Sequence, residues 1–86
     1  MQDCIKREYP SACNMGIVYN GESLITPCGM VTDVKRLHLT VLVDCSIVMQ
    51  MDDVLPRSVF SFTNVSRVHV LKYNNGEHYL FVTRFY

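Results

Sequence analysis

Basic and aromatic side chains gather in the last third of this 86-residue chain. Residues 57–86 hold four of the eight Lys and Arg residues, one of the eight Asp and Glu residues, and seven of the nine aromatic residues. Rings that stack on bases and cations that meet phosphates are what a single-stranded nucleic-acid platform needs. The same composition is typical of strands whose aromatic residues form a core and whose cations face solvent. The candidate binding residues of this segment are Arg67, Lys72, Tyr73, His78, Tyr79 and Arg84.

The spacing around Asn75-Gly76 predicts a close approach of two arginines. Asn-Gly supplies the positive φ angles that a two-residue hairpin turn requires. Pairing outward from that turn places Arg67 directly opposite Arg84. Like charges at that spacing destabilise a sheet, so we expect a phosphate or an acidic partner to neutralise them. A three-residue loop, 74–76, would shift the register and remove the arginine pair.

Metal and catalytic chemistry have little support in the residue pattern. A strong zinc signal requires close cysteine pairs, whereas Cys4, Cys13, Cys28 and Cys45 are widely spaced. No nucleophile motif or phosphate-binding glycine loop is present, and Asp52-Asp53 is typical of a solvated turn. The sequence therefore predicts that the protein is not an enzyme, and that it has no catalytic residue, no metal and no cofactor.

A second Asn-Gly pair, Asn20-Gly21, predicts a tight hairpin in the first third of the chain. Extending the pairing from a two-residue turn places Cys13 opposite Cys28. In an oxidising compartment, a disulfide could form between Cys13 and Cys28. We favour the interpretation that Cys13 and Cys28 are two small residues at the base of the hairpin and that their thiols are free.

The clearest periodicity in the chain lies between Leu37 and Met51, where every odd position is apolar. Strict alternation predicts one strand with one buried face. At about 3.3 Å per residue this strand would extend roughly 50 Å, longer than the roughly 30 Å diameter of a domain this size. We therefore expect it to bend and serve two sheets, to project toward another subunit, or to coil around a small barrel.

These patterns together predict an all-β protein with one domain. The expected fold is a small barrel or sandwich of five to seven antiparallel strands, with the two Asn-Gly hairpins. At most one short helical turn is expected, within Met30–Arg36. Residues 1–12 are expected to form an arm or a short turn, and residues 13–86 a single compact β domain. A chain of this length excludes a two-domain enzyme.

The expected function is that of a non-enzymatic protein-interaction module that self-associates as a homodimer. The final strand, Tyr79–Tyr86, is apolar on both faces, and such a strand at a sheet edge invites pairing with another chain. Its candidate self-association residues are Leu80, Val82 and Tyr86. Such a module could be an adaptor, an inhibitor, or a viral accessory or structural factor. The alternative is a small-barrel protein that binds single-stranded nucleic acid through the basic, aromatic segment.

Charge and hydropathy give an expected location. The formal net charge is zero, whereas nucleic-acid-binding domains are usually clearly basic. No apolar leader opens the sequence, and no apolar run approaches the roughly 20 residues that cross a bilayer. We therefore expect a cytoplasmic or nuclear protein without a membrane partner.

Overall fold

Seven strands form one mixed sheet in the computed structural model, which describes residues 7–27, 29–73 and 75–85, with side chains from residue 13 onward. The strand order is β3-β2-β1-β6-β7-β4-β5, and no helix occurs in those ranges. β4 pairs with β7 in parallel, and the other neighbours are antiparallel. The strands are β1 (Arg7–Tyr19), β2 (Leu24–Thr26), β3 (Gly29–Val31), β4 (Arg36–Val43), β5 (Ser46–Met51), β6 (Ser58–Lys72) and β7 (Glu77–Arg84).

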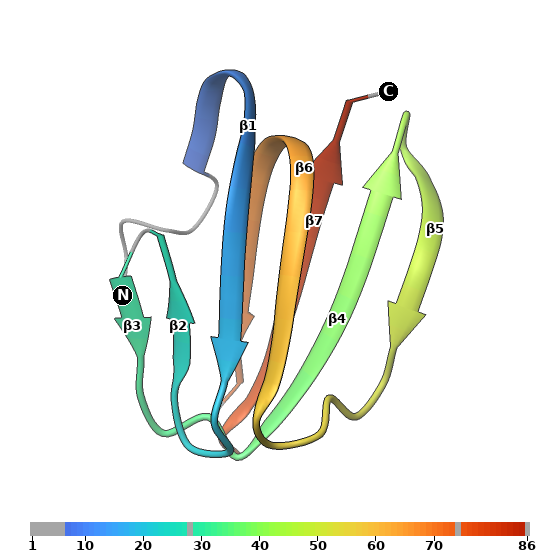
Figure 1. Cartoon of the computed structure of the whole chain (residues 1–86). Helices are drawn as coiled ribbons and strands as arrows, with labels where there is room; N and C mark the ends of the chain where they lie inside the picture. The colour runs from blue at the N-terminus through green and yellow to red at the C-terminus, as the bar shows by residue number, and fades with distance from the viewer. Residues whose placement is uncertain (1–6, 28, 74, 86) are drawn as a thin grey trace.

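The two longest strands, β1 and β6, fold this sheet into two layers. Both turn over at the same end of the molecule (Figure 1). Their pairing shifts register on either side of Cys13, and the β6–β7 pairing shifts between Val65 and Arg67. Asn64, at the bend of β6, has a φ of 57°. Because β-bulges bend and twist a strand, these irregularities let one strand serve both layers.

The first layer contains β3, β2, the second half of β1 and the first half of β6 (Figure 1). The second layer contains the start of β1 and the second half of β6, followed by β7, β4 and β5. The apolar core lies where alternate side chains of the two layers meet. Its buried members are Met15, Ile17, Tyr19, Leu24, Val31, Val34, Leu37, Leu39, Val41, Val54, Phe62, Val65, Val68, Val70, Leu80 and Val82.

The segment expected to be one long strand is instead the β4–β5 hairpin. Asp44 and Cys45 connect the two strands, with φ angles of 51° and 64°. A two-residue type I′ turn requires positive φ at both positions, and glycine normally supplies one of them. The pairing also shifts by one residue beside Val41. Beyond this shift Met49 and Met51 pair with Val41 and Leu39, whereas Ile47, before it, pairs with Leu42. The odd-numbered residues at the far end of β5 therefore return to the face of Val41 and Leu39, and the sequence alternation gives no sign of the turn.

The Asn20-Gly21 hairpin is present, but its register differs from the expected one. Tyr19 pairs with Leu24, so four residues form the connection. The side-chain oxygen of Asn20 accepts hydrogen bonds from the backbone N–H groups of Glu22 and Ser23, at 3.1 and 2.8 Å. An asparagine that bonds backbone groups ahead of it stabilises such a wider turn.

The expected position of Cys13 opposite Cys28 involves a residue outside the described part of the chain. Cys13 lies in β1 opposite Val65 of β6, with its thiol free and 3.6 Å from the Val65 carbonyl oxygen. Cys28 falls outside the described residues.

Two further expectations about the architecture are corrected. Residues 7–12, expected in an arm, lie in β1, where Arg7 and Glu8 pair with Val68 and Arg67 of β6. The sheet does not close into a barrel, and its β4–β7 pairing is parallel rather than antiparallel. The all-β class and the number of strands, seven, are confirmed. No helical turn forms in residues 30–36, which contain the end of β3, a loop and the start of β4.

Candidate interaction surfaces

Between the hydrogen-bonded residues Tyr73 and Glu77, the β6–β7 hairpin loop contains three residues, 74–76, and this removes the expected arginine pair. Lys72 pairs with His78, and the backbone N–H of Tyr73 donates to the carbonyl of Glu77 at 2.9 Å. Gly76 has a φ of 82°, as expected where a three-residue loop ends on a left-handed residue. The register therefore differs by one residue from that of a two-residue turn. Arg67 pairs with Thr83, and Arg84 pairs with Val65.

Arg84 has a structural partner at the bend of β6. Its Nε donates to the Thr63 carbonyl oxygen at 2.9 Å, and its Nη2 donates to Thr63 Oγ1 at 3.1 Å. The backbone N–H of Phe85 donates to the Asn64 carbonyl at 2.7 Å. These bonds attach the end of β7 to the turning point of β6.

Glu77 is the centre of a group of side chains joined by hydrogen bonds and ring contacts, which we call the Glu77 cluster: His38, Tyr73, Asn75, Glu77 and Tyr79. Glu77 Oε1 lies 2.7 Å from His38 Nε2 and accepts from the Tyr79 hydroxyl at 2.9 Å, while Oε2 accepts from Asn75 Nδ2 at 3.2 Å. The His38 and Tyr79 rings stack 4.3 Å apart, and Tyr73 meets Tyr79 edge-on at 5.2 Å.

The hydrogen bonds of the Glu77 cluster shift the pKa values of Glu77 and Tyr79. The Tyr79 hydroxyl and then the Asn75 amide hold the pKa of the Glu77 carboxyl below its ordinary value. The bond to Glu77 raises the pKa of the Tyr79 hydroxyl. Both carboxylate oxygens are already used within the cluster, so it resembles a structural network rather than a site awaiting a ligand.

The structure brings Tyr73 and Tyr79 into contact and pairs Lys72 with His78, but it does not gather the six predicted binding residues on one surface. Tyr73 and Tyr79 belong to the Glu77 cluster, and Arg84 holds Thr63. Arg67 and Lys72 differ by an odd number of positions along β6, so their side chains leave opposite faces of that strand.

His78 lies in the core, fully buried, with Nδ1 3.2 Å from the Gly76 carbonyl oxygen. Its Nε2 has no hydrogen-bond partner among the described residues. This imidazole cannot contribute to an outer binding face, because it points between the layers with the other buried side chains of β7.

The predicted self-association edge at the C-terminal strand is wrong. β7 is an interior strand between β6 and β4. Leu80 and Val82 are 1% and 0% exposed, so neither can meet another molecule in the folded protein. Tyr86 falls outside the described residues.

The edge that sequence reasoning missed is β5. Within the described part of the chain, β5 pairs only with β4. Its sequence, Ser-Ile-Val-Met-Gln-Met, has no charge and no proline. Ile47, Val48 and Met49 are 57%, 55% and 38% exposed. Natural sheets usually protect such an edge with charge, proline, a bulge or a short strand. β5 has a one-residue bulge at Val48 but neither charge nor proline, and the opposite edge, β3, has only three residues.

A cleft separates β5 from the first half of β6. It has a volume of about 420 Å³ and opens where the edges of the two layers lie near each other. Apolar side chains dominate its walls, and one arginine is the charged lining residue. The lining residues are Val41, Val48, Met49, Phe60, Ser61, Phe62 and Arg84. We call this the β5–β6 cleft.

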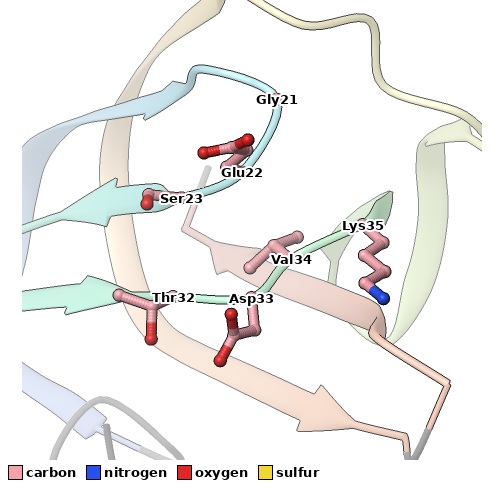
Figure 2. A pocket seen from close by; sticks show the side chains of 7 residues that line it. All are labelled: Gly21, Glu22, Ser23, Thr32, Asp33, Val34 and Lys35. Atoms are coloured by element: carbon pink, nitrogen blue, oxygen red, sulfur yellow. The ribbon is translucent and has the colours of Figure 1, made fainter.

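A second, more polar cavity of about 600 Å³ lies between the β1–β2 and β3–β4 loops (Figure 2). Its lining residues are Gly21, Glu22, Ser23, Thr32, Asp33, Val34 and Lys35. The side chains of Asp33 and Lys35 point away from the loop that carries Glu22, so the charged groups do not converge (Figure 2). No group of three or more His, Cys, Asp and Glu side chains suited to a metal ion occurs among the described residues.

Among the described residues, no helix is long and apolar enough to cross a membrane. Comparison of the chain with family models, curated proteins and solved structures found no match.

Proposed function

We propose that this protein is a non-enzymatic interaction module that self-associates by antiparallel pairing of β5 with β5 of a second copy. One observation carries the proposal: an uncharged six-residue strand with exposed apolar side chains lies at the edge of the sheet. The proposal keeps the expected class of function and moves the interface from β7 to β5.

Backbone chemistry supports strand addition at this position. On the side of β5 away from β4, no strand of the described chain pairs with its backbone. An added strand would supply hydrogen bonds to those N–H and C=O groups, as in β-augmentation. It would also cover Ile47 and Val48, whose removal from water is favourable.

The absence of charge favours a second copy as the partner. A two-fold axis brings the same strand of each copy together in antiparallel orientation. Charged residues repeated at such an axis would face each other and repel. β5 has none between Ser46 and Met51, so two copies can pair without an electrostatic penalty.

The test is sedimentation velocity over a concentration series, with Val48→Lys as the disrupting variant. A lysine at this edge should leave the fold intact and weaken dimerisation at least about tenfold, because ammonium groups would meet at the interface. Val59→Lys is the matched control, since Val59 is also a strand valine and is 68% exposed. A wild-type monomer at all concentrations, or equal effects of both variants, would contradict the proposal.

The same preparation can test nucleic-acid binding. Phosphate contacts weaken steeply as salt rises, because bound counterions return to the nucleic acid. Under the proposal, labelled single-stranded oligonucleotides show no salt-sensitive anisotropy change with the wild-type protein. Binding that collapses with salt and disappears in Lys72→Glu would instead favour the alternative function.

A further inference from the structure

The β5–β6 cleft places five apolar side chains beside one hydrogen-bonded arginine. Its volume of about 420 Å³ lies within the range of roughly 300–1,000 Å³ that is typical of small-molecule sites. Met49 of β5 is partly exposed at the cleft, whereas Phe62 of β6 is buried beside it. The Phe60 and Phe62 rings lie nearly parallel, with centroids 6.1 Å apart, and form one wall.

Arg84 provides the charge at this cleft. Its hydrogen bonds to Thr63 use two of its five N–H groups and involve only neutral oxygens. No carboxylate among the described residues forms an ion pair with it. The guanidinium is therefore held in position, keeps its full charge, and has N–H groups left for a carboxylate.

We propose that the β5–β6 cleft binds a medium-chain fatty acid. The hydrocarbon chain would lie between β5 and the first half of β6, against Met49 and Phe60. The carboxylate would accept hydrogen bonds from Arg84. A fatty acid fits because it offers one anionic group next to apolar surface, and because the arginine that lines the cleft has no counter-ion among the described residues. This inference does not rest on the pairing of β5, since one copy of the chain forms the whole cleft.

The test is an amide NMR titration of the full chain with dodecanoate below its micelle concentration. Saturable shifts should appear at Val48, Met49 and Phe60. Two comparison ligands separate the contributions of the hydrocarbon tail and the carboxylate of dodecanoate. 1-Dodecanol has the hydrocarbon tail without the charge, and butanoate has the charge with only a short tail. Both should bind at least about tenfold more weakly, given the strength of charged hydrogen bonds and of apolar burial.

Matched variants locate the carboxylate. Arg84→Gln should weaken dodecanoate binding at least about tenfold and leave dodecanol binding within about twofold. Arg57→Gln, outside the cleft, should change neither. Because Arg84 also holds Thr63, a second pair keeps the test decisive if Arg84→Gln does not fold. At the exposed Val48, Val48→Asp should repel the carboxylate and weaken binding, whereas Val48→Asn should retain it.

Several results would overturn the fatty-acid site: no saturable shifts at the cleft, equal affinity for dodecanol, or identical dodecanoate affinities in Val48→Asp and Val48→Asn. The failure of this proposal is distinguishable from the failure of self-association. Val48→Lys should break the dimer while adding a cation beside the carboxylate, so it should keep dodecanoate binding.

Discussion

β5 and β7 are both rich in apolar residues, but they lie in opposite environments. β7 has a strand on each side, and its inward side chains Leu80 and Val82 are buried in the core. Within the described ranges β5 has one neighbouring strand, and Ile47 and Val48 remain exposed. The difference arises from the parallel β4–β7 pairing, which places β7 inside the sheet and leaves β5 at its edge. Apolar composition therefore identifies strands, whereas topology decides which of them can meet another molecule.

The largest expected contrast between these strands comes from placing the same charge in each. Val82→Lys would bury an ammonium group without a partner and should lower the free energy of unfolding by about 4 kcal/mol or more. Val48→Lys should change it by less than about 0.5 kcal/mol, as is usual for exposed positions. Chemical denaturation followed by circular dichroism measures both. Similar losses of unfolding free energy in the two variants would contradict the placement of β7 inside the sheet and β5 at its edge.

A second prediction concerns the turn that creates the edge strand. Cys45 has a left-handed φ of 64°, a conformation that costs most residues other than glycine roughly 1–2 kcal/mol. Because glycine also loses more entropy on folding, Cys45→Gly should stabilise the protein by about 1 kcal/mol. Cys45→Ser removes the thiol without relieving the backbone and should have no effect. If the serine variant gained as much as the glycine variant, backbone strain would not be the cause.

These positions also show what the sequence could and could not predict. Alternation and Asn-Gly pairs located most of the strands and both expected hairpins, because side-chain period and turn chemistry are local properties. The turn at Asp44-Cys45 contains no glycine, and the shifted register beside Val41 preserves the alternation across it. No local pattern reports a parallel pairing between β4 and β7.

The candidate surfaces were harder to predict than the strands. Register errors of one residue at 74–76 were enough to separate Arg67 from Arg84. The β5 edge depends on which strands become neighbours, and the β5–β6 cleft depends on the bend of β6 at Asn64. The one local signal for the edge was the uncharged run Ser46–Met51.

A third prediction uses the pH dependence of the Glu77 cluster. The pKa of Glu77 is lowered in the folded state, so its contribution is present above its unfolded value of 4.5 and declines as pH falls through the folded value. Glu77→Gln should therefore lower Tm at pH 7, by less than Val82→Lys does. The difference from the wild type should narrow below about pH 4.5. A difference that stays constant into acid would show that the charge of Glu77 is not involved.

The smallest effect is expected at the exposed ion pair between Arg36 and Asp53. Arg36 Nε and Asp53 Oδ1 lie 2.6 Å apart, and the two side chains are 58% and 60% exposed. The Arg36 guanidinium lowers the pKa of Asp53, but solvent screens pairs of this kind. Asp53→Asn should leave Tm at pH 7 nearly unchanged. A loss as large as that of Glu77→Gln would contradict this view of the pair.

The most direct test of the central claim is amide hydrogen exchange at low and high protein concentration, read separately for 46–51 and 77–84. If β5 pairs with a second copy, its outward-facing amides exchange quickly in dilute protein and become protected as concentration rises. Amides of β7 should be protected at every concentration, because β7 lies inside the sheet. Exchange in β5 that does not change with concentration would contradict self-association through this edge.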